Sequence, residues 1–328
     1  MARIYQPFSL IIAGPISSRF KTEVSENLNE KALRKCFKII KSIDQRNELI
    51  ISTYEGEVSS HVNEFSDQVI LNFDPGADLV KDSPWPLGDK SRRSQRNYSR
   101  LFYSSLNGIA AAKNNVVIKT RVELIPVNEK LFRKWYLEIE QVLDEGKIAF
   151  FTEAYSGVQF AIDGVIPKMP DILLVSTKKT AVSLWGNSHK FWNSNKEILS
   201  RKCIILPLGS EQILGLIYLN KYYGLNIDKY LYKLRLHHVS LELMAKLIQA
   251  ENESFIWTRY KNSGFSQNYF KGLTFIKVPK NIISKSQKLL YKKILIMFLK
   301  KIKHFFRRYL SGLKTQSFSW IQNLIHTR

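Results

Sequence analysis

The sequence predicts an α/β fold with a mostly parallel central sheet, followed by a basic amphipathic helical C-terminal tail. Short apolar segments alternate with segments of helical periodicity through the first half of the chain, a pattern typical of parallel sheets covered by helices. The last part of the chain combines positive charge with an apolar stripe. With 328 residues, 45% of them hydrophobic and 12% aromatic, the chain is too apolar to be a disordered polycation.

The first elements alternate regularly. An apolar strand over residues 8–14 ends in a Gly-Pro turn, and apolar residues at helical spacing predict a helix over 24–43. Two runs rich in β-branched and apolar residues, 48–56 and 68–76, have the character of central strands of a parallel sheet.

A polar loop over residues 78–96 leads to a predicted helix at 97–112, a strand at 115–125 and a helix at 128–144. After residue 145 the alternation is less regular. The later predicted elements are strands at 148–155, 158–163 and 170–177 and helices at 180–187, 210–223 and 226–250.

The ends of the first strands are the expected place for a ligand, because open parallel sheets bind ligands at the carboxyl ends of their strands. Compared with the strand bodies, these ends are rich in acids, hydroxyls and glycines. They are Gly14-Pro15, Thr53 to Gly56, Asp74 to Gly76 and Arg121 to Glu123.

The charge is concentrated at the C-terminus. The chain has 50 Lys and Arg against 28 Asp and Glu, a net charge of +22. From Ser254 onward there are 16 basic and no acidic residues, so this part carries +16, and the remaining 34 basic and 28 acidic residues give the first 253 residues +6. This partition predicts a globular domain over 1–253 and a cationic C-terminal segment over 254–328.

Residues 285–313 place apolar side chains on one helical stripe and cations on another, which predicts a membrane-surface helix. Each of the nine Lys and Arg residues between 285 and 308 could contribute about 1 kcal/mol near an anionic leaflet. The apolar run Ile294 to Leu299 disfavours the competing interpretation, nucleic-acid binding. A basic helix packed on the protein's own core is a third interpretation.

Two cysteines, Cys36 and Cys203, lie in apolar runs and form no disulfide framework, which favours a reducing compartment. No stretch approaches the roughly 20 apolar residues of a membrane-spanning helix. We therefore expect a cytoplasmic protein that associates peripherally with the inner membrane.

The ordered segments IIAGPI, ELIISTYEGE, QVILNFDPGA, NYSRLFYSSLNGI and VIKTRVELI resemble the WavE-type lipopolysaccharide synthesis family. The later segments PDILLVSTKKTAVSLW and SEQILGLIYL resemble it as well, so the resemblance covers about residues 8–222. It implies a GT-A-like nucleotide-sugar fold and a glycosyltransferase that moves a sugar from a nucleotide-sugar donor to a lipopolysaccharide core, capsular or other surface glycan.

The sequence departs from the family pattern at three places. Ala13 stands where the family has Gln before Gly-Pro, and Pro170 stands where it has Ser before Asp171. In the pattern Lys-x-Arg-Ser/Thr-Asp this chain has Val122 and Glu123 at the last two positions. Glu123 keeps the carboxylate but moves it by one methylene, and Val122 removes a hydroxyl.

Sugar transfer needs neutralisation of the leaving diphosphate, a site for the nucleotide and activation of the acceptor hydroxyl. The turn after the first strand could let the backbone approach the donor closely, or could simply end the strand. Asn97 and Arg100, at a helix start, could meet phosphate or ribose oxygens, or could belong to a solvated basic loop. The residues assigned to donor binding are Gly14, Pro15, Thr53, Glu55, Asn97, Arg100, Lys119 and Arg121.

The resemblance makes Glu123 the counterpart of the metal-binding acid found at the end of this strand in many GT-A enzymes. It is therefore the candidate ligand for Mg²⁺ or Mn²⁺, ions that prefer hard oxygen ligands. The alternative is an ion pair with Arg121 or Lys119, whose cations would then contact the phosphates without a metal. Asp171 and Glu211 are the candidates for the general base, with Asp171 favoured; Glu211 could instead be a first-turn acid that stabilises its helix.

The expected partners are a nucleotide sugar, a glycan or glycolipid acceptor and, through the C-terminal helix, an anionic membrane surface; no nucleic acid is expected. The alternative function is a non-catalytic or nucleic-acid-binding basic protein.

Overall fold

The computed structural model describes residues 5–16, 23–56, 60–76, 78–79, 95–151, 158–161, 164–167, 169–199, 210–228, 241–260 and 263–266. All of them lie in the first of two compact units, Met1–Lys277. Most of residues 254–328, including the predicted membrane-surface helix, lie outside the described residues, and so do Cys203 and the stretch 229–240.

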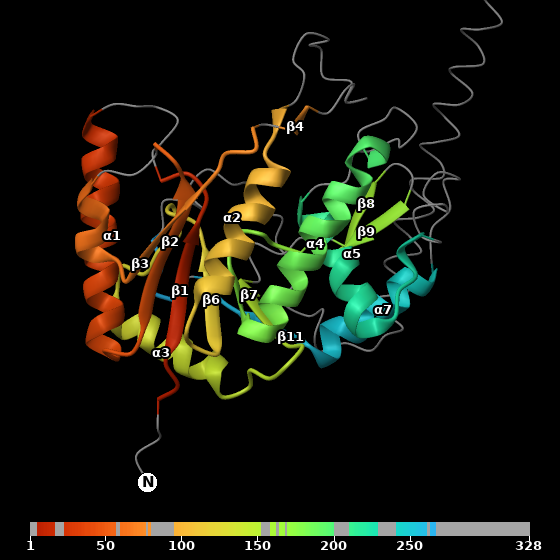
Figure 1. Cartoon of the computed structure of the whole chain (residues 1–328). Coiled ribbons are helices and arrows are strands. Elements are labelled where there is room, and N and C mark those ends of the chain that lie inside the picture. The colour runs from red at the N-terminus through yellow and green to blue at the C-terminus, as the bar shows by residue number, and fades with distance from the viewer. Residues whose placement is uncertain are drawn as a thin grey trace, which may run out of the picture. The chain divides into compact units, whose positions relative to one another are not determined.

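A seven-stranded sheet forms the centre of this unit (Figure 1). Its strands lie in the order β11-β7-β10-β6-β1-β2-β3. The neighbours β6, β1, β2 and β3 are parallel, whereas β10 runs antiparallel to both β6 and β7. The predicted mostly parallel α/β fold is confirmed. The strands are β1 (Phe8–Ala13), β2 (Glu48–Tyr54), β3 (Gln68–Asn72), β6 (Val116–Thr120), β7 (Ile148–Phe151), β10 (Leu174–Thr177) and β11 (Phe255–Thr258).

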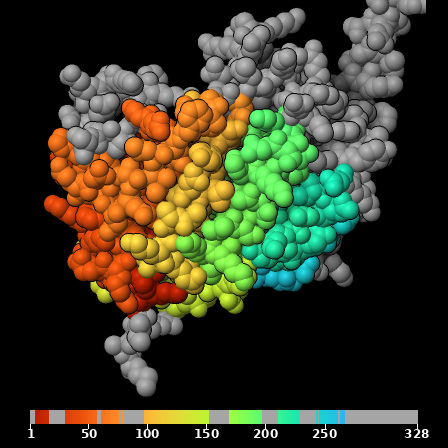
Figure 2. Space-filling model, in the orientation of Figure 1, coloured from red at the N-terminus to blue at the C-terminus, as the bar shows by residue number. Residues whose placement is uncertain are grey.

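Helices cover both faces of the sheet. On one face α1 and α3 pack with the short helix η1, because α1 presents a buried stripe that contains Leu33, Cys36 and Ile40. On the other face α2, α4, α5 and α7 bury a second core, and Figure 2 shows α2, α4 and α5 as neighbouring bands coloured yellow to turquoise. The helices are α1 (Glu23–Ile43), η1 (Ser60–Phe65), α2 (Tyr98–Ala111), α3 (Glu129–Glu140), α4 (Lys178–Leu199), α5 (Ser210–Tyr223) and α7 (Leu241–Glu253).

Helix α2 lies unusually close to the sheet. A Cβ atom added at Gly108 would stand 2.6 Å from Ile11 Cγ2 and 2.8 Å from Ser52 Cβ. Ser52 also donates a hydrogen bond from Oγ to the Ser104 carbonyl oxygen at 2.7 Å. The missing side chain at Gly108 therefore sets the distance between α2 and strands β1 and β2, and with it the position of the start of the helix.

Three expectations from the sequence change in the structure. The strand at 68–72 is the edge of the sheet rather than central, and Leu71 is 54% exposed. The helix expected at 180–187 extends over Lys178–Leu199, because the buried Ser188 and Trp192 continue its inner face through polar sequence. Strand β11 lies beyond Glu253 and pairs with β7, so the sheet includes residues that we expected to begin the C-terminal segment.

Two short hairpins stand outside the main sheet. Strands β4 (Asp78–Leu79) and β5 (Gln95–Arg96) pair within the segment expected to be a loop, and β8 (Val158–Ala161) pairs with β9 (Gly164–Pro167). Within the described ranges, no helix has both the length and the apolar character needed to cross a membrane.

Candidate active site

The carboxyl ends of β1, β2, β3 and β6 lie at one edge of the sheet, since the four strands are parallel neighbours. Strand β1 is followed directly by Gly14, whose φ of +106° is strained for any residue with a side chain. Its N–H donates a hydrogen bond to the Ser52 carbonyl oxygen at 3.0 Å, and the following Pro15 is exposed. The turn after β1 therefore keeps its backbone close to β2 and presents little side chain.

At the end of β2 the two candidate residues differ. Thr53 is fully buried, and its Oγ1 has no hydrogen-bond partner among the described residues. The side chain of Glu55 is exposed, while its N–H donates to the Asn72 carbonyl oxygen at 3.2 Å. Glu55 thus offers a carboxylate at the sheet edge, whereas Thr53 lies inside the fold.

Arg100, in the first turn of α2, points to the end of β3. Its Nε donates to Asp74 Oδ1 at 2.6 Å, and its Nη2 donates to Asp74 Oδ2, so the ion pair is bidentate. A third donor, Nη1, reaches Asn97 Oδ1 at 3.2 Å. These hydrogen bonds from Arg100 lower the pKa of Asp74. Arg100 and Asn97, the two candidates at the start of this helix, thus lie in contact, and Asp74 holds the guanidinium in place.

The start of α2 is capped by a carboxylate from a distant segment. Asn97 stands at the capping position but its side chain makes no capping hydrogen bond. Asp78 instead accepts from the Ser99 N–H at 2.8 Å and from Ser99 Oγ at 2.5 Å. Trp192 of α4 donates from Nε1 to Ser99 Oγ at 3.0 Å. Asp78 therefore stabilises the positive end of the helix and links it to α4.

Lys119 in β6 is fully buried rather than exposed at the sheet edge. Its Nζ donates to the Asp171 carbonyl oxygen and lies 4.7 Å from the centre of the Trp185 ring. Burial lowers the pKa of Lys119 to about 8, and the charge of Asp171 partly opposes this shift. The ammonium group thus joins β6 to the segment before β10 and to α4.

The turn after β6 holds Arg121 and Glu123. Arg121 Nη2 lies 3.5 Å from Glu123 Oε1, and both side chains are partly exposed. The Glu123 carbonyl oxygen accepts from Ser266 Oγ at 2.6 Å, so the turn is attached to the segment 263–266. This is the ion pair that we weighed as the alternative to a metal ligand. Within the described part of the chain, no three His, Cys, Asp or Glu residues gather into a metal-binding group.

The two candidate bases, Asp171 and Glu211, are linked through Ser210 at the start of α5. Asp171, 9% exposed, precedes β10, which enters the sheet at the same edge because it is antiparallel to β6. Asp171 Oδ2 accepts from Ser210 Oγ at 2.9 Å, and Ser210 begins α5 directly before Glu211. The Glu211 carbonyl oxygen accepts from the Met169 N–H at 2.9 Å. Ser210 Oγ therefore fixes one carboxylate oxygen of Asp171 and leaves the other for a further donor.

The sequence analysis did not select Asp74, Asp78 or Ser210. Asp74 holds Arg100, Ser210 holds Asp171, and Asp78 caps the helix that carries Arg100. Asp74 stood in the right place, directly after a strand that ends at this edge. The roles of Asp78 and Ser210 depend on contacts across 21 and 39 positions of the chain, which no local pattern reveals.

Residues 8–142 match the family described as WavE lipopolysaccharide synthesis. The resemblance seen in the sequence is confirmed over this segment, which contains β1, β2, β3 and β6 and the residues from Gly14 to Glu123. The later part of the resemblance, which carries Asp171 and Glu211, stays a prediction.

Solved structures of low sequence identity also resemble the chain. A nucleotidyl transferase from Methanothermobacter thermautotroptrophicus is 16% identical, with 67% of this chain and 83% of that chain covered and a TM-score of 0.34. 4-Diphosphocytidyl-2C-methyl-D-erythritolsynthase from Anaerococcus prevotii is 11% identical, with 78% of this chain and 91% of that chain covered and a TM-score of 0.35. Mannose-1-phosphate geranyltransferase from Thermus thermophilus is 9% identical, with 64% of this chain and 67% of that chain covered and a TM-score of 0.34. No curated protein matches the sequence.

Proposed function

We propose that this protein is a glycosyltransferase that moves a sugar from a nucleotide-sugar donor to a lipopolysaccharide core or another surface glycan. The observation that carries the proposal is the family match over residues 8–142, because the matched segment supplies the four parallel strands whose ends form the candidate site. A mostly parallel α/β sheet with polar strand ends is suited to a nucleotide.

In the proposed reaction an acceptor hydroxyl oxygen forms a bond to the anomeric carbon of the donor, while the bond from that carbon to the diphosphate oxygen breaks. The leaving diphosphate gains negative charge as this bond breaks. Arg100 and Arg121, both partly exposed beside the strand ends, would stabilise that charge. The backbone turn at Gly14 would lie against the nucleotide, where a glycine permits close approach.

Asp171 is the proposed general base, which takes the proton of the acceptor hydroxyl. Its backbone carbonyl is held by Lys119 and its Oδ2 by Ser210, so the carboxylate has a fixed position. A positioned base typically accelerates proton transfer by about 10²–10⁴-fold. Glu211, one residue from Ser210, is the second candidate.

Mg²⁺ or Mn²⁺ would supply further charge neutralisation at the diphosphate. Mg²⁺ is often held by one or two carboxylates together with substrate phosphates, so the partly exposed Glu123 fits such a role despite its contact with Arg121.

The function is tested by incubating the full chain with a panel of nucleotide sugars and measuring donor hydrolysis and transfer to glycan acceptors. We expect turnover with one donor class and its loss in the Asp171→Asn variant. Absence of donor binding, together with salt-sensitive binding of DNA, would contradict the proposal and favour the non-catalytic alternative.

We further propose that the cationic segment 254–328 holds the enzyme at the cytoplasmic face of the inner membrane. The support is compositional, namely the charge of +16 and the apolar stripe within 285–313. Deleting residues 281–328 should weaken the binding of the protein to anionic liposomes, and unchanged liposome binding would reject this attachment.

A further inference from the structure

The outer face of α1 carries a row of lysines. Lys31, Lys35 and Lys38 are exposed, and their spacing of four and three residues places them above one another on the helix. At a rise of about 1.5 Å per residue, the row extends about 10 Å along the helix axis. The opposite stripe of α1, with Leu33 and Cys36, is buried against the sheet. The lysines therefore stand on the surface that α1 turns away from the core.

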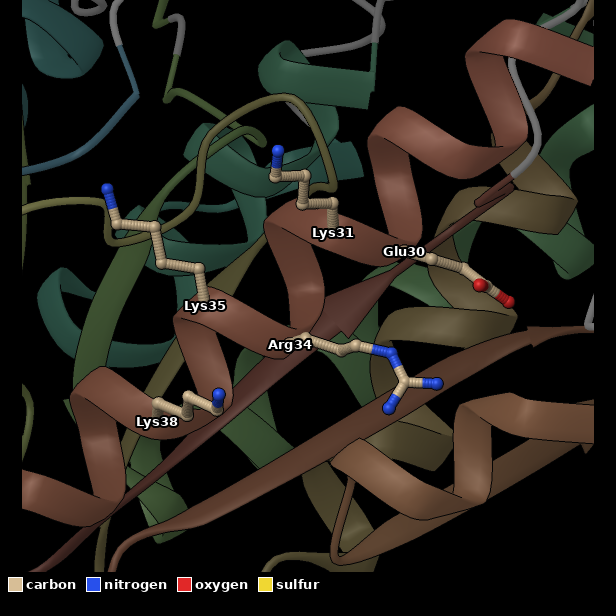
Figure 3. A pocket seen from close by; sticks show the side chains of 5 residues that line it. All are labelled: Glu30, Lys31, Arg34, Lys35 and Lys38. Carbon is tan, nitrogen blue, oxygen red and sulfur yellow. The ribbon is translucent and has the colours of Figure 1, made fainter.

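These lysines line a hollow of about 440 Å³ together with Glu30 and Arg34 (Figure 3). Figure 3 shows Glu30 and Arg34 pointing to one side of the helix, while Lys31 and Lys35 extend away from that side. Arg34 is already engaged, because its Nη2 lies 2.9 Å from Glu64 Oε2 and its guanidinium lies 4.5 Å from the centre of the Phe65 ring.

The charge of the row is not compensated within the described part of the chain. None of the three lysines forms an ion pair there, whereas Lys41 on the same helix pairs with Asp67 at 2.6 Å. Like charges at a spacing of four residues destabilise a helix. Contact with a negatively charged surface would offset the repulsion among these lysines and is therefore favourable.

We propose that this lysine row is a docking surface for an anionic membrane. Ammonium groups on flexible stems suit a diffuse layer of lipid phosphates, whereas specific recognition of a single phosphate favours the planar fork of arginine. Arg34, which lines the hollow, is held by Glu64. Among the described residues that line the hollow there is no aromatic side chain on which a base could stack, which argues against single-stranded nucleic acid.

The contact is electrostatic, because the described residues that line the hollow are all charged. We therefore expect it to be reversible and to weaken with salt, since charges at an exposed surface are screened within about 10 Å at 0.1 M ionic strength. The proposal depends neither on the transfer reaction nor on the C-terminal segment, so it can fail or succeed independently of both.

The first experiment measures the partition of the full chain onto vesicles of phosphatidylglycerol and phosphatidylcholine at low ionic strength. The test variant combines Lys31→Gln, Lys35→Gln and Lys38→Gln. The matched control combines Lys130→Gln, Arg133→Gln and Lys134→Gln, which removes three exposed cations from α3, where the acidic residues Glu129, Glu138 and Glu140 are interspersed.

We expect the α1 variant to lower the partition constant by about 10-fold to 100-fold, as three lysines near an anionic surface should, and the α3 variant to lower it much less. Equal losses in the two variants would show a general effect of net charge and overturn the proposal. An unchanged partition constant in the α1 variant would overturn it as well.

The second experiment locates the contact in the unmodified protein. Acetylation rates of Lys31, Lys35 and Lys38 are measured by mass spectrometry with phosphatidylglycerol vesicles, phosphatidylcholine vesicles, inorganic phosphate or single-stranded DNA present. Slower acetylation with phosphatidylglycerol vesicles alone is the expected result. Equal rates in all conditions, or slowing by phosphate or DNA but not by vesicles, would overturn the proposal.

Discussion

Lys119 Nζ lies 4.7 Å from the centre of the Trp185 ring, so a buried cation on the sheet faces the indole of a helix. Both side chains are fully buried, and the same ammonium donates to the Asp171 carbonyl oxygen. A lysine that is removed from water in this way is expected to lose part of its preference for the charged state. This arrangement makes the stability of the protein depend on pH.

Replacing Lys119 by Met should change how stability varies with pH. Burial lowers the pKa of Lys119 to about 8 in the folded protein, from 10.5 as its ordinary value. Between these pH values the unfolded chain binds the proton and the folded chain does not, so the folded wild type gains stability as the pH rises. Relative to Lys119→Met, we expect the free energy of unfolding of the wild type to increase by up to about 3 kcal/mol between pH 7.5 and 10.5.

Urea denaturation of both proteins across this pH range measures the difference, in which the other titrating groups cancel. Lys130→Met, at an exposed lysine of α3, is the control and should show no such trend. A difference between wild type and Lys119→Met that does not vary with pH would contradict the prediction.

Replacing Gly108 by Ala should destabilise the protein, because the new Cβ would stand 2.6 Å from Ile11 Cγ2 and α2 would have to move. Overpacking of this kind typically costs about 1–3 kcal/mol. Gly186→Ala in α4 is a matched control, since the nearest atom to its added Cβ is Leu106 Cδ1 at 3.6 Å. Thermal or urea unfolding should show a loss for Gly108→Ala and no loss for Gly186→Ala; equal effects would count against the close approach of α2.

Replacing Arg100 should weaken donor binding if its guanidinium meets the diphosphate. Hydrogen bonds to charged groups contribute about 1.5–3 kcal/mol, so we expect Arg100→Ala to raise the KM for the nucleotide sugar by roughly 10-fold to 100-fold. Arg100→Lys should have an intermediate effect, because it keeps the charge but cannot form the bidentate pair with Asp74. Arg133→Ala, at an exposed position of α3, is the control. Steady-state kinetics with an unchanged KM for Arg100→Ala would exclude this role.

The choice between the two candidate bases can be made from kcat. If Asp171 accepts the acceptor proton, Asp171→Asn should lower kcat by about 10²–10⁴-fold, and Glu211→Gln should have a much smaller effect. The loss of kcat in Ser210→Ala should lie between the losses in these two variants. This substitution removes the hydrogen bond to Asp171 Oδ2 at 2.9 Å but leaves the carboxylate in place. A larger loss in Glu211→Gln than in Asp171→Asn would reverse the assignment.

A metal held by Glu123 would make transfer sensitive to chelation. We expect EDTA to abolish transfer, Mn²⁺ or Mg²⁺ to restore it, and Glu123→Gln to raise the metal concentration needed for half of the maximal rate. Glu138→Gln, at an exposed acid of α3, should leave that concentration unchanged. Equal rates with EDTA and with Mn²⁺ would show that the ion pair with Arg121 is the whole role of Glu123.

The sequence predicted the order of the strands and helices well where local patterns decide them. The runs around Ile11, Ile50 and Ile118 are apolar enough to identify buried parallel strands, and Gly14 marks the end of the first. The edge position of β3 was missed because β-branched residues do not reveal how many neighbours a strand has. Leu71 is exposed because β3 is the last strand of the described sheet, with β2 as its neighbour on one side.

The candidate site was predictable in position but not in its internal contacts. The rule that ligands meet the carboxyl ends of parallel strands indicated the edge with Gly14, Glu55 and Arg121. It could not show that Lys119 is inside the fold, because a lysine at a strand end is normally expected to reach solvent. Nor could it show that Asp74 holds Arg100, since this pair spans 26 positions of the chain.

The reversed direction of β10 has a consequence for how a transferase with this fold could diversify. Because β10 is antiparallel to β6, the residues that precede it, Asp171 among them, arrive at the sheet edge from a part of the chain outside the family-matched segment 8–142. If the proposed roles hold, the groups that bind the donor and the base that serves the acceptor would belong to separate stretches of sequence, joined by the hydrogen bonds between β6 and β10. Mutations in the second stretch could then change the acceptor while the first stretch keeps its donor site.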